Sequence, residues 1–345
     1  MKVFNVMAGA AVGGAETAFA ELVSAQKSAG FDVHAVCRPS ARNAALREAG
    51  VPLTELPFGG FLDFTTTPAL KKLIATEKPD VVVTWMNRAA KKLPRNGNYK
   101  WIARLGGYYD LKYYNGVDHF VVNAPDIGRW MREQGVAENK ISFIPNFAEV
   151  AADAAPVSRA SLDTPENAFV FLALGRLHTN KAFDILLKAM ADVPDAYLWL
   201  AGEGPERKTL ETLTKTLNIQ NRVRFLGWRD DRWSLLAACD AFVFPSRHEP
   251  FGNSFMQAWA AGRALITTNS QGPSYYVRNN VDALVTPVDD VEELAKAMKK
   301  IAADKDLREK LAVTGKLSYA QAFDKTSILT QWQRLFSECS CTPKH

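Results

Sequence analysis

The sequence from Asp240 to Gly262 reads D-A-F-V-F-P-S-R-H-E-P-F-G-N-S-F-M-Q-A-W-A-A-G, and it combines a short apolar run, a polar bend and a helix pattern. The run Asp240–Phe244 predicts a buried strand, and the helix is expected to begin near Asn253 or Ser254. Between them, Glu249 stands in the bend, beside the backbone N–H groups of the helix end. Because such an end attracts anions and a carboxylate accepts from hydroxyls, the stretch predicts a site for a ligand with both phosphates and hydroxyls.

Short apolar runs alternate with longer helical patterns on both sides of this stretch, which is typical of βαβ units and parallel sheets. The expected strands are Val3–Met7, Asp32–Cys37, Val81–Thr84, Trp101–Leu105, His119–Val122, Ile141–Ile144, Phe169–Leu174, Tyr197–Ala201, Val223–Leu226, Ala241–Phe244, Ala264–Thr267 and Ala283–Val285. The expected helices are Ala15–Ala29, Pro68–Glu77, Pro125–Gln134, Phe183–Ala191, Glu206–Leu217, Arg232–Ala238, Ser254–Ala261 and Val291–Ala303. The pattern predicts an α/β fold of two doubly wound domains, in which ligands bind at the carboxyl ends of the strands. Two such domains facing each other form a deep cleft.

The domain boundaries follow from length and composition. A chain of 345 residues fits two domains of roughly 150 to 180 residues each. Between Pro145 and Pro165 the pattern changes to Ala, Asp, Ser and Pro, which predicts a linker. We expect residues 1–150 to form the first domain and residues 166–315 the second. Residues 316–345 are then a helix that crosses back to the first domain, followed by a tail.

Charge is concentrated in the first half of the chain. Residues 1–150 contain 18 Lys and Arg against 14 Asp and Glu, whereas residues 151–345 contain 24 against 23. One interpretation is an ordinary solvated surface. The other is an anionic partner, such as a phosphorylated acceptor or the face of a membrane, and we expect no nucleic acid partner. The basic residues that fit this second interpretation are Lys71, Lys72, Arg88, Lys91, Lys92, Arg95 and Lys100.

Cysteine usage and the absence of targeting signals bear on location. Cys37 and Cys239 lie in or beside apolar segments and are expected to be buried thiols, which indicates a reducing, cytoplasmic compartment. The first apolar run is interrupted by Asn5 and Glu16, which argues against a secretory signal. No window approaches the ~20 apolar residues of a membrane span, so any membrane contact is expected to be peripheral.

A glycine pair, Gly13-Gly14, follows the first predicted strand and precedes a helix. Glycines there allow a ligand to approach the backbone, and the next N–H groups can hold an anion or a sugar oxygen. The alternative is a tight turn in which Glu16 stabilises the helix dipole. The pattern G-x-G-x-x-G is absent here, and Gly202-Glu203-Gly204 also lacks it, so a nicotinamide-dependent enzyme is not expected.

Two cations, Arg176 and Lys181, follow the strand Phe169–Leu174 on one strand-to-helix loop. Both side chains can converge on a diphosphate, since Arg offers a planar fork and Lys a compact charge. The alternative is plain surface solvation. For the opening stretch, the alternative is that Ser254 and Gln257 form a capping box that satisfies the helix end and nothing more.

Together these motifs resemble the retaining glycosyltransferases of family four, which have the GT-B fold of two Rossmann-like domains. The family's glycine loop resembles Gly13-Gly14, and its donor-phosphate pair resembles Arg176 and Lys181. Three further motifs occur in family order, so the resemblance covers nearly the whole chain. They are A-G-x-G-P at 201–205, F-L-G-W at 225–228 and P-S-x-x-E-P-F-G at 245–252.

The resemblance implies a role for each matching residue. Arg176 and Lys181 stabilise charge on the leaving nucleoside diphosphate, and Glu249 holds hydroxyls of the transferred sugar. No protein nucleophile, cofactor or metal is implied. The residues expected to bind the donor are Gly13, Gly14, Gly202, Gly204, Trp228, Phe251, Gly252, Asn253 and Gln257.

The chain departs from the family pattern at two places. The family usually has a second glutamate eight residues after the first, which binds ribose hydroxyls, and this chain has Gln257 there. An amide can still bind one hydroxyl without charge assistance, so a weakening of about 1 kcal/mol is expected rather than loss of binding. Where the first domain of the family often carries histidines, this chain offers Asn87 and Arg104 as acceptor-side candidates. His119 lies in a strand pattern and is expected to be structural.

The resemblance therefore predicts transfer of a sugar, with retention, from a nucleotide sugar to a cell-envelope saccharide or glycolipid such as a lipopolysaccharide core. A UDP-sugar is the expected donor because it is the commonest in the family. A nucleotide-sugar epimerase of the same architecture, or a non-catalytic nucleotide-sugar binding module, remains as an alternative.

Overall fold

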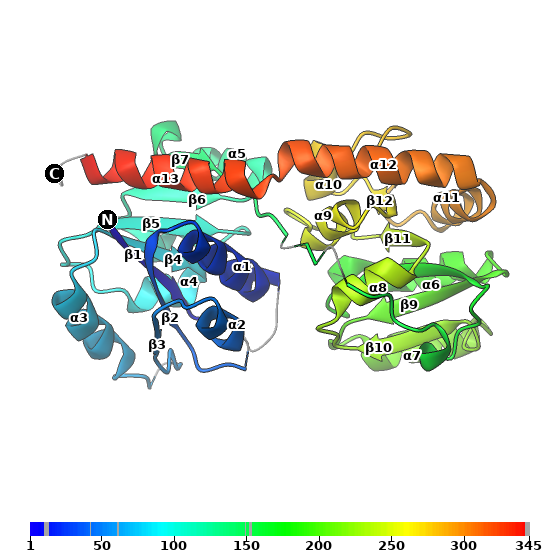
Figure 1. Ribbon diagram of the computed structural model, residues 1–345, viewed down its shortest axis with the longest axis horizontal. Helices are drawn as coiled ribbons and strands as arrows, with labels where there is room; N and C mark the ends of the chain where they lie inside the picture. Colours follow the sequence, from blue (N-terminus) through cyan, green and yellow to red (C-terminus); the bar gives the residue numbers. More distant parts are fainter. Residues whose placement is uncertain (10–13, 42, 61, 149, 152–153, 342–345) are drawn as a thin grey trace. The chain divides into compact units, whose positions relative to one another are not determined.

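The computed structural model describes residues 1–9, 14–41, 43–60, 62–148, 150–151 and 154–341 (Figure 1). The chain forms two compact units, each built on its own sheet. Unit 1 comprises Met1–Phe147 and the C-terminal segment that starts at Phe323, and unit 2 comprises Ala148–Ala322. The first boundary thus lies three residues before the expected position 150, and the C-terminal segment joins unit 1 at Phe323 rather than at 316.

Unit 1 contains a seven-stranded sheet in the order β3-β2-β1-β4-β5-β6-β7. Every described pairing is parallel. The strands are β1 (Lys2–Met7), β2 (Asp32–Cys37), β3 (Leu53–Glu55), β4 (Val81–Trp85), β5 (Lys100–Leu105), β6 (His119–Val122) and β7 (Ile141–Phe143). The helices are α1 (Gly14–Ser28), α2 (Asn43–Glu48), α3 (Thr66–Glu77), α4 (Met86–Lys92), α5 (Pro125–Glu133) and α13 (Lys325–Cys341), with short 3-10 turns η1 (Leu111–Tyr114) and η2 (Glu138–Lys140). The sequence patterns did not predict β3, α2 or α4.

Unit 2 contains a six-stranded parallel sheet in the order β10-β9-β8-β11-β12-β13. Its strands are β8 (Phe169–Leu174), β9 (Ala196–Ala201), β10 (Val223–Gly227), β11 (Ala241–Phe244), β12 (Ala264–Thr268) and β13 (Leu284–Thr286). Its helices are α6 (Phe183–Ala191), α7 (Arg207–Thr216), α8 (Arg232–Ala238), α9 (Asn253–Ala260), α10 (Gln271–Tyr276), α11 (Val291–Ala303) and α12 (Lys305–Ala322), with 3-10 turns η3 (Ala160–Leu162) and η4 (Thr179–Lys181). Short α10 was not predicted.

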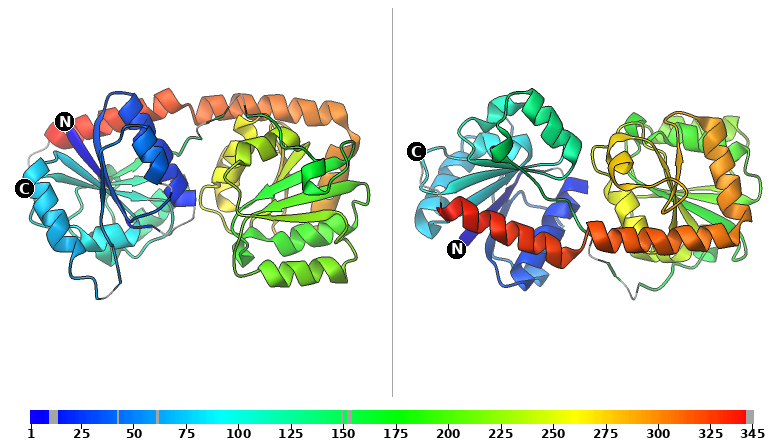
Figure 2. Two further views of the ribbon diagram at one scale, coloured as in Figure 1. Left: turned by 60° about the horizontal axis from the view of Figure 1, so that its bottom comes forward. Right: turned by 90° about the horizontal axis from the view of Figure 1, so that it is seen from above.

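Helices cover both faces of each sheet, as Figure 2 shows. The central strands are therefore buried on both faces, and this is why they are runs of Val, Ile, Leu and Phe rather than alternating patterns. In both sheets the strand order reverses between neighbours, β1 and β4 in unit 1 and β8 and β11 in unit 2. Ligands of doubly wound sheets bind outside the carboxyl ends of the strands at such points. The two switch points therefore mark where each unit can bind a ligand.

The expected C-terminal helix of residues 316–345 is in fact the end of one helix, α12, and a second helix, α13. Helix α12 packs closely on α9 in unit 2, because a Cβ added at Gly315 comes within 2.5 Å of the Trp259 ring. Helix α13 belongs to the core of unit 1, where Trp332 and Phe336 are almost fully buried. The break at the start of α13 thus coincides with the change of unit.

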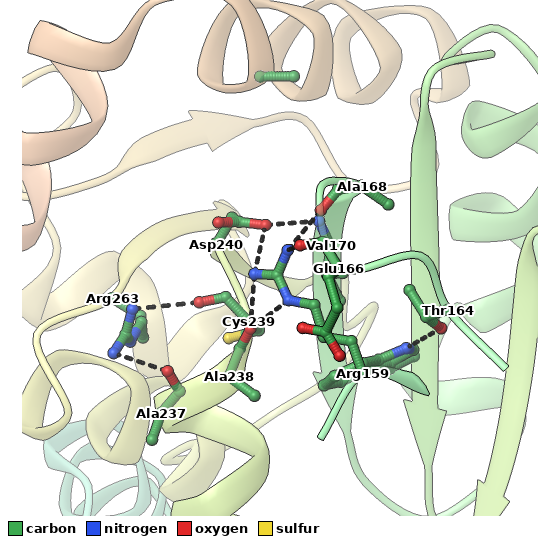
Figure 3. A network of polar contacts seen from close by, with 12 residues as sticks. Arg159, Thr164, Glu166, Ala168, Val170, Ala237, Ala238, Cys239, Asp240 and Arg263 are labelled. Carbon is green, nitrogen blue, oxygen red and sulfur yellow. Dashed lines mark hydrogen bonds and ion pairs between the residues drawn. The ribbon is translucent and has the colours of Figure 1, made fainter. Parts of the chain in front are cut away.

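The amino-terminal edge of the unit 2 sheet is tied together by Arg159 (Figure 3). Its guanidinium donates to the carbonyl of Ala238 at 2.8 Å and to the carboxylate of Asp240 at 3.1 Å. It also donates to the carbonyls of Glu166 and Ala168, and the same Asp240 carboxylate accepts the N–H of Val170 at 2.8 Å. The predicted linker segment is thus anchored where β8 and β11 begin.

Predictions were also made for the cysteines and for membrane-spanning helices. Cys37 and Cys239 are buried free thiols, as predicted, and burial raises the pKa of each to about 12. Among the described helices, none is long and apolar enough to span a bilayer.

Candidate functional site

The loop after β8 carries the two predicted phosphate-binding cations. Lys181 ends the turn η4, and Ala182 after it adopts a left-handed conformation, with φ of 52°, before α6 begins. The Lys181 ammonium forms an ion pair with the carboxylate of Glu249, and their side chains are 22% and 17% exposed. Arg176 is exposed, and its guanidinium makes no hydrogen bond or ion pair with any described residue. The structure thus joins the predicted phosphate-binding lysine directly to the predicted sugar-binding carboxylate.

Glu249 is held in place through its backbone as well as its side chain. Its N–H donates to the side-chain oxygen of Gln271 at 3.3 Å, and its carbonyl accepts the N–H of Gly272 at 2.8 Å. A Cβ at Gly272 would lie 2.2 Å from the carbonyl oxygen of Phe251, so only glycine allows this approach. The start of α10 therefore fixes the bend that presents Glu249.

Helix α9 begins at Asn253, and its N-cap is Gly252, which has φ of 98° and no side chain to satisfy the first-turn N–H groups. Phe251, next to it, is 3% exposed and packs edge-on against Tyr276. Because Ser254 is the second residue of the helix, it stands in the wrong register for a capping box with Gln257. That alternative is wrong.

The Gln257 side chain lies on α9 and is 7% exposed. Its amide makes no hydrogen bond with any described residue. Neither amide atom is among the fully buried side-chain atoms that lack a partner, so the amide reaches solvent at the surface of the helix. Gln257 is thus a polar group that a ligand can satisfy.

Close packing between two loops requires glycine at positions 202 and 204. A Cβ at Gly202 would lie 1.8 Å from the carbonyl oxygen of Gly175, and a Cβ at Gly204 would lie 2.3 Å from that of Leu177. The loop after β9 therefore runs directly against the loop that bears Arg176 and Lys181. The two glycines determine the position of this cation-bearing loop, whatever contact they also make with a ligand.

Trp228 follows β10, the edge strand, which lies two strands from β8. Its ring is 43% exposed, and its indole N–H donates to Asp230 at 2.9 Å. Its predicted contact with the donor therefore depends on a ligand that reaches across the end of β9.

Arg247 is a residue that the sequence motifs did not single out. Its guanidinium binds both oxygens of Asp184 at 2.7 and 2.8 Å, the carboxylate of Asp289 and the carbonyl of Thr179 at 2.7 Å. Its own N–H donates to the carbonyl of Asn180 at 2.8 Å. Burial tends to raise the pKa of Asp184, but the hydrogen bonds from Arg247 outweigh it and hold the pKa below its usual value. Arg247 thus braces the turn that carries Lys181 against the bend that carries Glu249.

In unit 1, Gly14 and Asn87 follow β1 and β4, the neighbouring strands where the sheet order reverses. Gly13 lies outside the described residues. Met86 lies between β4 and Asn87, and its backbone φ of 61° is rare for a residue other than glycine. The hydroxyl of Tyr114 donates to the side-chain oxygen of Asn87 at 2.8 Å, so the amide nitrogen of Asn87 is left for another partner.

Arg104, the other acceptor-side candidate, is only 3% exposed. Its guanidinium donates to the carbonyl of Ile144 and to the side chain of Asn146, both at 2.7 Å, and it lies 5.8 Å from the ring of Trp332. Contact with an acceptor is therefore not favoured, and the geometry instead gives Arg104 a structural role beneath α13. His119, which was expected to be structural, is bonded to Ser142 at 2.8 Å.

Unit 1 also has a recess of about 130 Å³ at the carboxyl ends of β1 and β2. Its polar lining includes Glu16, Arg38 and Asn43. This recess lies on the same edge of the sheet as Gly14 and Asn87, so a ligand bound at the switch point of unit 1 has polar groups beside it.

Comparisons with known proteins agree with this architecture. The family model described as "Glycosyltransferase Family 4" matches residues 12–151, and that described as "Glycosyl transferases group 1" matches residues 155–317. The chain is 36% identical over 339 residues to the lipopolysaccharide core biosynthesis glycosyltransferase LpsD of Rhizobium meliloti (strain 1021), covering 97% of this chain and 98% of the relative. LpsE of the same organism is also 36% identical, over 94% of this chain and 96% of its own.

Solved structures show the same fold. The Anabaena protein HepE in complex with UDP-glucose superposes with a TM-score of 0.86 at 20% identity, over 98% of this chain and 100% of that one. A glycosyltransferase from Rickettsia africae superposes with a TM-score of 0.86 at 18% identity, over 99% of both chains. With two parallel doubly wound units and relatives that match along nearly its whole length, the chain is a glycosyltransferase of GT-B fold and belongs to family four.

Proposed function

We propose that this protein moves a sugar from a UDP-sugar to a saccharide acceptor of the lipopolysaccharide core, with retention of configuration and without a metal ion. The names of LpsD and LpsE support this acceptor class. The complex of the Anabaena protein with UDP-glucose supports the donor class. We expect the protein to act in the cytoplasm, at the inner face of the cytoplasmic membrane.

The observation that carries the proposal is the ion pair between Lys181 and Glu249 at the carboxyl edge of the unit 2 sheet. In the structure, Glu249 neutralises Lys181. When the diphosphate of a donor binds Lys181, the carboxylate is released to accept hydrogen bonds from sugar hydroxyls. A ligand with phosphates and hydroxyls thus replaces the ion pair between Lys181 and Glu249, because its phosphates bind Lys181 and its hydroxyls bind Glu249.

The chemical step follows from this charge arrangement. The bond from the anomeric carbon to the phosphate oxygen breaks, and the acceptor oxygen bonds to that carbon on the same face. The acceptor proton passes to the departing phosphate oxygen, so no protein base is needed. Arg176 and Lys181 stabilise the charge that develops on the leaving diphosphate, and each such contact is worth on the order of 10²–10³ in rate. Glu249, released from Lys181, accepts hydrogen bonds from the sugar hydroxyls and acts by orienting the sugar.

Gln257 fits the ribose of the nucleotide. Its side chain is largely buried on α9, and its amide makes no hydrogen bond with a described residue. A ribose hydroxyl can donate to the amide oxygen or accept from its nitrogen. On the acceptor side, Asn87 offers its amide nitrogen, because Tyr114 already occupies the oxygen.

Donor and stereochemistry can be tested together. Calorimetric titration with UDP, GDP and ADP should show the tightest binding for UDP. The product formed from a UDP-sugar and a lipopolysaccharide core acceptor should keep the donor's anomeric configuration by proton NMR, and the rate should be unchanged in EDTA. An inverted product, or a rate abolished by EDTA, contradicts the mechanism. An epimer formed without acceptor, or donor binding without turnover, contradicts the function.

A further inference from the structure

The bend that presents Glu249 is held from two sides. On one side, the N–H of Arg247 donates to the carbonyl of Asn180 at 2.8 Å, in the turn η4. On the other side, the N–H of Glu249 donates to the side-chain oxygen of Gln271 at 3.3 Å, at the start of α10. The backbone of the bend thus joins the turn η4 to helix α10.

The Gln271 amide is bonded at both of its ends. Its oxygen accepts the N–H of Glu249, and its nitrogen lies 2.9 Å from Nδ1 of His248. The reverse orientation of the amide would set its NH₂ group against a backbone N–H, and two donors cannot bond each other. The two partners therefore fix the orientation of the Gln271 side chain.

This orientation also determines which nitrogen of His248 carries the proton. The Gln271 nitrogen can only donate, so Nδ1 of His248 is the acceptor. The tautomer that makes this bond carries its proton on Nε2 alone. Without the acceptor, the Gln271 amide would lose one of the two bonds that hold it, and a glutamine side chain regains rotamer freedom when it is released.

The proposed reaction makes the backbone bonds of the bend important for Glu249. In the structure, the Glu249 carboxylate is held by Lys181. Once the diphosphate of a donor binds Lys181, the direction of the carboxylate depends on the bend behind it. A small displacement of such an orienting group is costly in rate. Gln271 and His248 are both partly exposed, so water can take the place of either partner when it is lost.

We propose that Gln271 and His248 are positioning residues that hold Glu249 toward the transferred sugar. His248 orients the Gln271 amide, and the amide fixes the backbone of Glu249. The inference rests on the proposed function, because Glu249 has to contact the sugar for its direction to matter. It gives a role to His248, which stands at an x position of the P-S-x-x-E-P-F-G motif, and to Gln271, which lies outside the motifs.

Ligand binding without an acceptor separates this role from a general structural one. Calorimetry compares UDP with UDP-glucose, UDP-galactose and UDP-N-acetylglucosamine. Glu249→Ala should weaken binding of the preferred sugar nucleotide but not of UDP, since UDP has no hexose for Glu249 to hold. Gln271→Leu should weaken the same binding about fivefold and leave UDP unchanged, because a hydrogen bond that positions Glu249 is lost. Gln220→Leu, at an exposed glutamine of unit 2, is the matched control and should bind both ligands as the parent does.

His248 is tested by whether a hydrogen-bond acceptor is kept. His248→Leu should weaken sugar-nucleotide binding about threefold. His248→Asn should recover the affinity of the parent, because its side-chain oxygen takes the place of Nδ1. The double variant H248L/Q271L should lose no more than Gln271→Leu alone, since His248 acts through Gln271. Additive losses, or a His248→Asn variant as weak as His248→Leu, overturn the role of His248.

Imidazole ¹⁵N NMR at mildly alkaline pH reads the tautomer directly. The His248 signals, identified by their absence from His248→Asn, should show an unprotonated Nδ1, and a proton on Nδ1 overturns the proposal. So does a Gln271→Leu variant that keeps the parent's sugar-nucleotide affinity where Glu249→Ala loses it, or one that loses UDP binding and Tm as well. If Glu249→Ala leaves sugar-nucleotide binding unchanged, the proposed function loses its sugar contact and the inference falls with it. Failure of the inference alone is therefore distinguishable from failure of the proposed function.

Discussion

Polar and charged residues lie at both edges of the unit 2 sheet, but they have different roles at each edge. At the amino edge, Arg159 has protein partners for its whole guanidinium, and its carboxylate partner Asp240 also accepts a backbone N–H (Figure 3). At the carboxyl edge, Arg176 is exposed without a described partner and Gln257 is buried without one. Polar groups that are fully bonded stabilise a fold, whereas groups that lack a protein partner are available to a ligand. The presence or absence of protein partners thus distinguishes the polar groups that stabilise the fold from those that can bind a ligand.

The largest effect is expected from Lys181→Ala. Loss of a preorganised cation should lower kcat on the order of 10²–10³-fold with little change in Tm. Steady-state kinetics and thermal unfolding measure both, and Arg176→Ala should act in the same direction. Lys208→Ala, an exposed lysine of α7, is the matched control and should keep full activity. Full activity of both the Lys181 and Arg176 variants would remove the basis for the donor site.

Arg159→Met should produce the opposite pattern. It leaves Asp240 and several carbonyls without their donor, and breaking such a network costs about 3 kcal/mol of unfolding free energy. Denaturant unfolding should show this loss, while kcat at low temperature stays near that of the parent. A large fall in kcat with unchanged stability contradicts the division between the two edges.

Arg247 lies at the carboxyl edge, yet its guanidinium is bonded to protein groups. Its substitution therefore tests whether a residue of this kind also affects the reaction. Arg247→Met should lower kcat about tenfold to a hundredfold with a smaller change in KM, because the Lys181 turn is no longer braced. Arg247→Lys should recover only part, since an ammonium cannot bind Asp184 through two parallel bonds. Arg229→Met, which breaks the exposed pair with Asp231, is the control. Equal losses of kcat in Arg247→Met and Arg229→Met indicate a general effect of surface charge.

The smallest effect is expected at Gln257. Gln257→Glu should tighten UDP binding by about 1 kcal/mol, because a carboxylate gives charge-assisted bonds to ribose hydroxyls. Calorimetry measures the affinity, and thermal unfolding of the ligand-free protein is the control. A change in Tm without a change in affinity shows that the residue serves helix α9 alone.

Local pattern was a good guide where burial on both faces leaves a strong apolar signal. Strands β2, β6, β8 and β11 have the bounds that the sequence predicted. Strand β3 and helix α10 were missed because three or six residues carry too little periodicity. The capping box failed by register, since helix α9 begins one residue before Ser254. Nothing in the sequence pairs Arg247 with Asp184, 63 positions away.

The sequence by itself determined the α/β class, the order of the strands along the chain and the motifs that identify family four. It did so because strand runs, glycine bends and helix starts are local properties of neighbouring residues. Only the tertiary structure decided that Lys181 meets Glu249, that Gly202 and Gly204 seat the cation loop, and that Arg104 lies under α13. Those contacts join residues far apart in the chain. They depend on which strands become neighbours in the sheet and on how closely the loops at its edge pack.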